Sequence, residues 1–123
     1  MEDLITGIFD CTGPIARAMP NYEARPEQRD MAMAVASAIL DSDTLVVEAG
    51  TGVGKSFSYL IPIAQHVLKS ETLAVISTNT ISLQEQIVHK DIPFLEKALG
   101  MDFKAEDAHE NDCLCRLAEH QGE

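Results

Sequence analysis

The chain has 123 residues, of which 46% are hydrophobic and 24% charged, and its formal net charge is −11. This length allows one domain with a core of its own, and the composition is typical of a globular protein. Three cysteines do not make the even set of a secreted disulfide scaffold, and no apolar run approaches the roughly 20 residues of a membrane span. Because Met1-Glu2-Asp3 also lacks the basic start of an export signal, we expect a cytoplasmic protein without membrane contact.

The negative charge is concentrated toward the end of the chain. Residues 101–123 carry seven acidic and two basic side chains. Such a surface repels nucleic-acid phosphate. If the protein handles DNA, we expect the basic track for it to lie elsewhere or to come from other parts.

The first half of the chain begins with two helical patterns. Within residues 1–25, apolar residues from Leu4 to Phe9 repeat at helical spacing and predict a short helix. A longer helix follows, because Pro26 suits the first helical turn and Glu27 complements the helix dipole. Its predicted apolar stripe consists of Met31, Val35, Ala38 and Ile39. The turn-forming residues 41–43 end it.

Two apolar segments predict buried strands. Thr44 to Ala49 and Leu73 to Thr78 are apolar enough to be central strands of a parallel sheet. The helix between them contains Pro62, which we expect to kink the helix rather than end it. Residues 103–105 have the character to begin a third strand. This alternation of helices and strands predicts a doubly wound α/β domain.

Further helices follow the second strand. Asn79 or Thr80 is suited to cap the next helix, although residues 82–85 also fit a capping box. Pro93 predicts the start of another helix, and Gly100 is suited to end it in a left-handed conformation.

A glycine-rich loop links the first strand to the helix that contains Pro62. It reads Ala49-Gly50-Thr51-Gly52-Val53-Gly54-Lys55-Ser56. Glycines let successive backbone N–H groups point at one anion, and the following helix adds its positive end. Lys55 would reach the β- and γ-phosphates of a nucleotide, and the Ser56 hydroxyl would ligate Mg²⁺. Ala49 stands where such loops usually begin with glycine.

Six segments carry a resemblance to one family. In chain order they are Tyr22–Gln28, Glu48–Ser56, Tyr59–Pro62, Ile76–Thr80, Leu83–Gln86 and Lys90–Leu95. Together they resemble the DinG-type, XPD-like DNA helicases of superfamily two, in order and spacing, over roughly residues 10–105. Alanine is common in that family at the position of Ala49.

The resemblance implies a fold and a function. It implies a partial RecA-like P-loop domain over residues 26–105, with a parallel sheet flanked by helices. A lead-in of residues 1–25 would precede it, and an acidic, poorly ordered tail of residues 106–123 would follow. The chain would be the ATP-binding N-terminal portion of an ATP-dependent DNA helicase, whose hydrolysis of ATP drives translocation on single-stranded DNA.

The resemblance also implies residue roles. Arg25 and Gln28 would lie on the adenine side of the ATP site, and Lys55 would be its catalytic lysine. The residues that would line the phosphates are Ala49, Gly50, Thr51, Gly52, Val53, Gly54, Lys55 and Ser56. Contacts to single-stranded DNA would come from Ser77, Thr78, Asn79, Thr80 and Gln84. Helix capping explains Asn79 and Thr80 equally well.

Two parts of the family's motor have no counterpart in this sequence. The family uses a D-E-A-H sequence, whose acids hold Mg²⁺ and polarise the attacking water, and a second RecA-like domain that supplies arginines. Residues 106–109 contain the same residue types with the acids exchanged. They follow the charged Asp102 and Lys104 rather than an apolar strand. We therefore expect the isolated chain to be inactive.

Cys113 and Cys115 lie where many relatives begin an iron–sulfur site. A cubane cluster needs four thiolates, and the third cysteine, Cys11, is distant in the sequence. We expect no cluster in this chain, although full-length relatives can hold one, and Cys115 is the better candidate for a remnant ligand. Two other functions stay open: a small P-loop phosphotransferase, or a non-catalytic fragment that associates through an open sheet edge.

Overall fold

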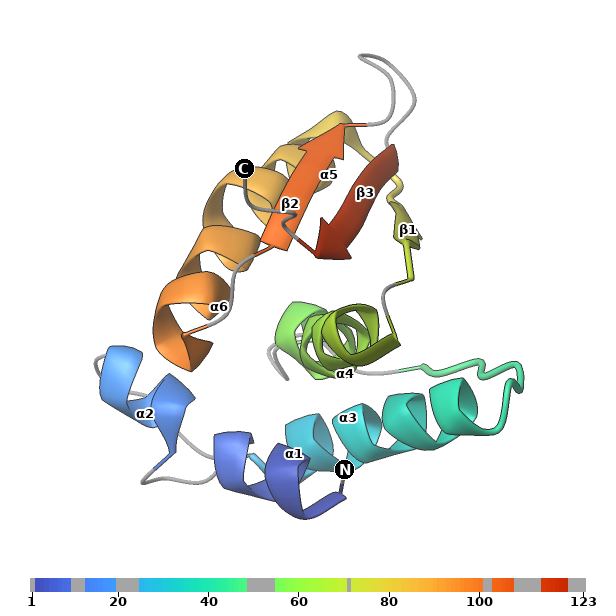
Figure 1. The fold of residues 1–123 in the computed structure, drawn as a ribbon, viewed down its shortest axis with the longest axis vertical. Coiled ribbons are helices and arrows are strands. Elements are labelled where there is room, and N and C mark those ends of the chain that lie inside the picture. The colour runs from blue at the N-terminus through green and yellow to red at the C-terminus, as the bar shows by residue number, and fades with distance from the viewer. Residues whose placement is uncertain are drawn as a thin grey trace. The chain divides into compact units, whose positions relative to one another are not determined.

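The computed structural model describes residues 2–9, 13–19, 25–48, 55–70, 72–100, 103–107 and 114–119. The chain divides into two compact units, Met1–Ile63 and Ala64–Glu123, and the division falls inside one long helix, α4. Figure 1 shows the helices and strands in chain order.

The first unit begins with a helix that the sequence predicted. Helix α1 (Glu2–Phe9) buries Ile5, Ile8 and Phe9 and packs against α2 (Pro14–Ala18) and α3 (Pro26–Leu40). The apolar spacing near the N-terminus therefore does mark a helix that contributes to the core. Helix α2 was not predicted; Pro14 occupies its first position, where the missing N–H costs nothing.

Helix α3 confirms the predicted start and end. Pro26 is its first residue, and it ends at Leu40, where Ser42 adopts a left-handed φ of 52°. Its most buried positions are Gln28, Ala32 and Ala36, spaced four residues apart along one face. The predicted apolar stripe is only half-buried, because the face with Gln28, Ala32 and Ala36 takes the buried position instead.

The predicted first strand is not a strand in its described part. Residues 44–48 are extended but exposed, and the side chain of Val46 is 92% accessible. A strand needs a neighbour to pair its backbone N–H and C=O groups. No described strand pairs with this segment, so its apolar composition alone does not produce a sheet. The prediction was wrong for these residues, and Ala49 lies outside the described residues.

Helix α4 (Lys55–Ser70) runs through Pro62 without ending, as predicted. The helix survives a residue that removes one hydrogen bond because its middle is deeply buried. Leu60, Ile61 and Pro62 are inaccessible to solvent or nearly so.

The sheet of the second unit is antiparallel rather than parallel. Its strands are β1 (Ala74–Ser77), β2 (Phe103–Asp107) and β3 (Leu114–Glu119), in the order β1-β3-β2. The pairs Ile76–Cys115 and Ala105–Leu117 set the two registers. A connection as short as that between β2 and β3 can close a hairpin, whereas parallel strands need a crossover of a dozen residues or more. The expected parallel sheet is therefore not formed by the described strands.

Strand β1 is also less buried than predicted. Ile76 is 8% exposed, but Val75 is 60% exposed, so one face of the strand is covered and the other is open. Strand β3 lies within residues 106–123, which we expected to be poorly ordered. Pairing with strands on both sides explains its order, because each partner satisfies one row of its backbone groups. The domain boundaries themselves stay predictions.

One long helical segment replaces the two helices predicted after β1. Helix α5 (Ile81–Gln86) continues through a π-helical turn, η1 (Ile87–Asp91), into α6 (Ile92–Leu99). The Ile92 N–H donates to the carbonyl of Ile87, five residues earlier. Pro93 has no N–H and its ring crowds the carbonyl four residues before it, so the widened turn lets the helix continue past it. Gly100 ends α6 at a φ of 66°, as predicted.

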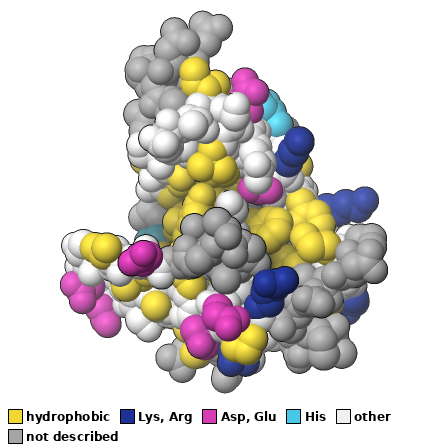
Figure 2. All heavy atoms as spheres, turned by 180° about the vertical axis from the view of Figure 1, so that it is seen from behind, with side chains coloured by type: hydrophobic (Ala, Val, Ile, Leu, Met, Phe, Trp, Pro, Cys, Tyr) yellow, Lys and Arg dark blue, Asp and Glu magenta, His cyan; other side chains and the backbone are white. Residues whose placement is uncertain are grey.

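Apolar side chains also reach the surface, and Figure 2 shows several of them on one face. In the part of the chain that the structure describes, no helix is both long enough and apolar enough to cross a bilayer.

Candidate nucleotide-binding site

The start of helix α4 carries the residues that the sequence singled out for phosphate binding. The helix begins at Lys55, immediately after the glycine-rich loop, and Ser56 is half-buried in its first turn. A 16-residue helix presents a partial positive charge at this end. Residues 49–54 lie outside the described residues, and only the backbone of Lys55 is described. The prediction that a helix begins at Lys-Ser is confirmed.

A buried hydrogen bond joins the start of α4 to the start of α3. The Ser58 hydroxyl donates to the backbone carbonyl of Gln28 over 3.0 Å, and Ser58 is 0% exposed. Ser58 lies one helical turn after Lys55, and Gln28 is the third residue of α3. The structure therefore brings the residue predicted for the adenine side next to the helix predicted to hold the phosphates.

Arg25 and Gln28 share one closed turn. The Arg25 carbonyl accepts hydrogen bonds from the backbone N–H groups of Gln28, at 3.1 Å, and of Arg29, at 3.3 Å. Arg25 is exposed, whereas Gln28 is only 6% exposed. Sequence reasoning selected both residues but missed Ser58. No local sequence signal marks Ser58, because its partner is a carbonyl 30 residues away in the sequence.

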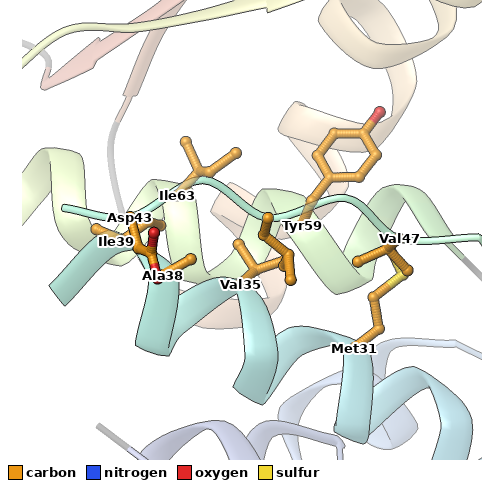
Figure 3. A pocket seen from close by; sticks show the side chains of 9 residues that line it. Met31, Val35, Ala38, Ile39, Asp43, Val47, Tyr59 and Ile63 are labelled. Carbon is orange, nitrogen blue, oxygen red and sulfur yellow. The ribbon is translucent and has the colours of Figure 1, made fainter. Parts of the chain in front are cut away.

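An apolar pocket lies elsewhere in the first unit. Figure 3 shows the extended segment of residues 43–48 passing over α3 beside α4. The pocket between them has a volume of about 340 Å³. The residues that line it include Met31, Val35, Ile39, Leu45, Val47 and Ile63. Its carboxylate, on Asp43, accepts a hydrogen bond from the Thr44 N–H at 2.8 Å. A pocket lined in this way offers no cation to a phosphate, so we do not assign the nucleotide to it.

Comparison with known proteins decides the family. The family model described as DEAD/DEAH box helicase matches residues 28–113, which is more than half of the chain. The chain belongs to the DEAD/DEAH box helicase family. Membership in this family carries a RecA-like P-loop fold, ATP binding and the use of ATP with Mg²⁺.

The curated relatives of this helicase segment are much longer than the segment itself. It is 42% identical over 95 residues to the ATP-dependent DNA helicase YoaA of Escherichia coli, covering 77% of this chain and 14% of that protein. It is 47% identical over 85 residues to the ATP-dependent helicase DinG of Mycobacterium tuberculosis, covering 69% of this chain and 13% of that protein. It is 39% identical over 83 residues to the ATP-dependent DNA helicase DinG of Escherichia coli, covering 66% of this chain and 12% of that protein.

These matches confirm the predicted resemblance to DinG-type helicases. The chain spans about one seventh of the length of the first of these relatives. No solved structure gives a significant match.

The residues predicted to contact DNA in this helicase segment lie in the second unit. Thr80 caps α5: its side chain accepts a hydrogen bond from the Leu83 N–H at 3.1 Å. The Thr78 hydroxyl donates to the Thr80 carbonyl at 2.8 Å. Of the three candidate caps for this helix, these hydrogen bonds favour Thr80. They do not favour Asn79, and Ser82, where a capping box would start, lies inside the helix.

The remaining predicted DNA contacts differ in accessibility. Ser77 and Asn79 are exposed, whereas Gln84 is only 2% exposed. Gln84 is thus the most covered member of this set. The DNA contacts of Ser77, Asn79 and Gln84 stay predictions, with Ser77 and Asn79 the accessible members of the set.

One carboxylate of the helicase segment is buried in the π-helical turn. Asp91 is 9% exposed, and burial raises its pKa above the ordinary value, although a hydrogen bond from Gln86 and the charge of Lys90 act in the opposite direction. Within the described ranges, no group of three or more His, Cys, Asp or Glu side chains gathers to hold a metal. Cys11 and Cys113 lie outside the described residues, so the expectation about an iron–sulfur cluster stays a prediction.

Proposed function

We propose that this chain is the ATP-binding portion of a DinG-like, ATP-dependent DNA helicase. The observation that carries the proposal is the hydrogen bond from Ser58 to Gln28, which joins the adenine-side turn to the helix that begins at Lys55. Two segments 30 residues apart in sequence are thus joined, and in this proposal both contact the nucleotide. The named relatives, YoaA and DinG, support the same activity for the whole protein.

In this proposal the ATP phosphates lie in the loop of residues 49–54, at the positive end of α4. Lys55 donates hydrogen bonds to the β- and γ-phosphates, and the side-chain amide of Gln28 reads the adenine edge, with Arg25 beside it. The Ser56 hydroxyl is the ligand for Mg²⁺, which neutralises charge on the phosphates when it is bound. A hard oxygen donor in the first turn of the helix suits this ion.

The chain binds ATP in this proposal but does not turn it over on its own. No acidic pair follows an apolar strand, and nothing in the sequence supplies the arginines of a second RecA-like domain. Single-stranded DNA is a partner of the whole helicase, with Ser77 and Asn79 as the accessible candidates for contact. A phosphotransferase is not favoured, because the relatives are named as helicases. Association through an open sheet edge stays a prediction.

A calorimetric titration with a non-hydrolysable ATP analogue and Mg²⁺ tests the proposal. Lys55→Ala removes charge-assisted hydrogen bonds worth roughly 1.5–3 kcal/mol, so affinity should fall by about 10- to 100-fold. Lys69→Ala is the matched control, because Lys69 is an exposed lysine at the other end of the same helix and should have no effect. Equal affinity for wild type and Lys55→Ala, or no binding to either, would refute the proposal.

A further inference from the structure

We infer that Ser58 is a positioning residue for adenine recognition: its hydroxyl fixes the turn that carries Gln28 relative to the phosphate-binding end of α4. This inference rests on the proposed ATP site and adds a residue that no motif of the sequence selected. Ser58 does not touch the nucleotide in this account. It acts through the carbonyl of Gln28, to which it donates a hydrogen bond of 3.0 Å.

The hydrogen bond between Ser58 and Gln28 is buried. Ser58 is 0% exposed and Gln28 is 6% exposed, so water cannot replace either partner readily. A buried hydroxyl that loses its acceptor pays the cost of desolvation, and this cost resists any separation of the two groups. The bond therefore holds the first turn of α3 against α4 in one position.

The elements on both sides of this hydrogen bond are held in place. Ser58 lies three residues after Lys55, so it sits one helical turn from the end that would hold the phosphates. The turn of α3 is closed on itself by the two hydrogen bonds that the Arg25 carbonyl accepts. A closed turn moves as a unit, so a shift at the Gln28 carbonyl also shifts the Gln28 side chain.

Adenine recognition requires a donor and an acceptor at fixed positions. A glutamine amide donates with its NH₂ and accepts with its oxygen, which matches the N7 acceptor and the N6 amine of adenine. Guanine presents two acceptors, N7 and O6, on the same edge and cannot satisfy the amide oxygen. Such a two-point match depends on position, and a side chain that is 6% exposed has little freedom to adjust. Loss of the Ser58 hydroxyl should therefore reduce discrimination between bases more than it reduces phosphate binding.

The test measures three ligands by calorimetry on the 123-residue chain in the presence of Mg²⁺. They are a non-hydrolysable ATP analogue, the matching GTP analogue, and inorganic tripolyphosphate, which has no base. For Ser58→Ala we expect the preference for adenine over guanine to fall about fivefold, the factor that corresponds to one hydrogen bond of about 1 kcal/mol. Affinity for tripolyphosphate should stay within about twofold of wild type.

Three further variants separate positioning from simple stability. Ser58→Thr keeps a hydroxyl and should keep the base preference. Ser70→Ala changes an exposed serine of the same helix and should change nothing. In a Gln28→Ala background, Ser58→Ala should have no further effect on the preference, because the two residues act on one contact. If Ser58→Ala does not fold, Ser58→Cys takes its place, because a thiol is a weaker donor of similar size.

The outcomes distinguish this inference from the proposed function. If Ser58→Ala weakens all three ligands by the same factor, or leaves the base preference unchanged, the positioning role is refuted while the ATP site stands. If wild type binds tripolyphosphate and both analogues equally, phosphate binding stands and adenine reading by Gln28 fails together with the role of Ser58. If wild type binds none of them, the proposed function fails and the inference fails with it.

Discussion

Replacement of Thr80 tests whether this residue stabilises the protein as a helix cap. Its side-chain oxygen accepts a hydrogen bond from the Leu83 N–H at 3.1 Å, which satisfies one of the unpaired donors at the start of α5. Thr80→Ala removes this acceptor, and loss of an N-cap typically costs about 1 kcal/mol. We expect the free energy of unfolding to fall by about that amount.

The size of the effect can be converted into a melting temperature. A chain of 123 residues has an unfolding entropy of roughly 0.26 kcal/mol/K near 60 °C. A loss of about 1 kcal/mol should therefore lower the midpoint by about 4 °C, as followed by circular dichroism during heating. Thr80→Ser retains the acceptor and should stay within about 1 °C of wild type.

Asn79→Ala is the matched control for this experiment. Asn79 is the exposed neighbour of Thr80 and was the other candidate for the cap. Its replacement should leave the midpoint unchanged. A loss of stability in Asn79→Ala that equals the loss in Thr80→Ala, or no loss in Thr80→Ala, would refute the assignment of the cap.

Two further predictions concern stability. Leu60→Ala removes a fully buried side chain of α4 and should cost about 3 kcal/mol in urea unfolding, whereas Leu40→Ala, at a position that is 62% exposed, should cost less than about 0.5 kcal/mol. Because burial raises the folded-state pKa of Asp91 above its unfolded value of 3.8, the folded state binds more protons than the unfolded state, and stability falls as pH rises from 3.8 through the raised pKa. The unfolding free energy of Asp91→Asn minus that of wild type should therefore be larger at pH 7 than at pH 3.5. An equal difference at both pH values would contradict this account.

Local sequence signals predicted several of the helix boundaries. Pro26 at the start of α3 and Gly100 after α6 act through backbone geometry that depends only on neighbouring residues. The start of α4 at Lys55 follows from the glycine-rich motif before it. The helix boundaries at these positions could therefore be predicted without knowledge of the tertiary structure.

The strands and the sheet were less predictable, because pairing depends on distant partners. Residues 44–48 have the composition of a buried strand but are exposed. Residues 114–119, which we expected to belong to a poorly ordered tail, form the middle strand of the sheet. The π-helical turn before Pro93 lets the helix continue past the proline, and no local sequence pattern predicts this turn.

In the candidate site, too, features set by local sequence could be predicted and features set by distant partners could not. The glycine-rich loop, Lys55 and Gln28 were selected from residue types and spacing. Ser58 could not be selected in this way, because its importance arises from a carbonyl 30 residues away in the sequence. Only the packing of α3 against α4 brings that carbonyl within reach.

Hydrogen–deuterium exchange with and without a non-hydrolysable ATP analogue and Mg²⁺ tests the central claim most directly. The claim is that one nucleotide is held jointly by the start of α3 and the start of α4. It predicts that exchange slows in peptides covering residues 25–30 and 50–60, while residues 94–99 of α6 serve as an unchanged reference. Slower exchange in neither segment, or protection only elsewhere in the chain, would contradict it.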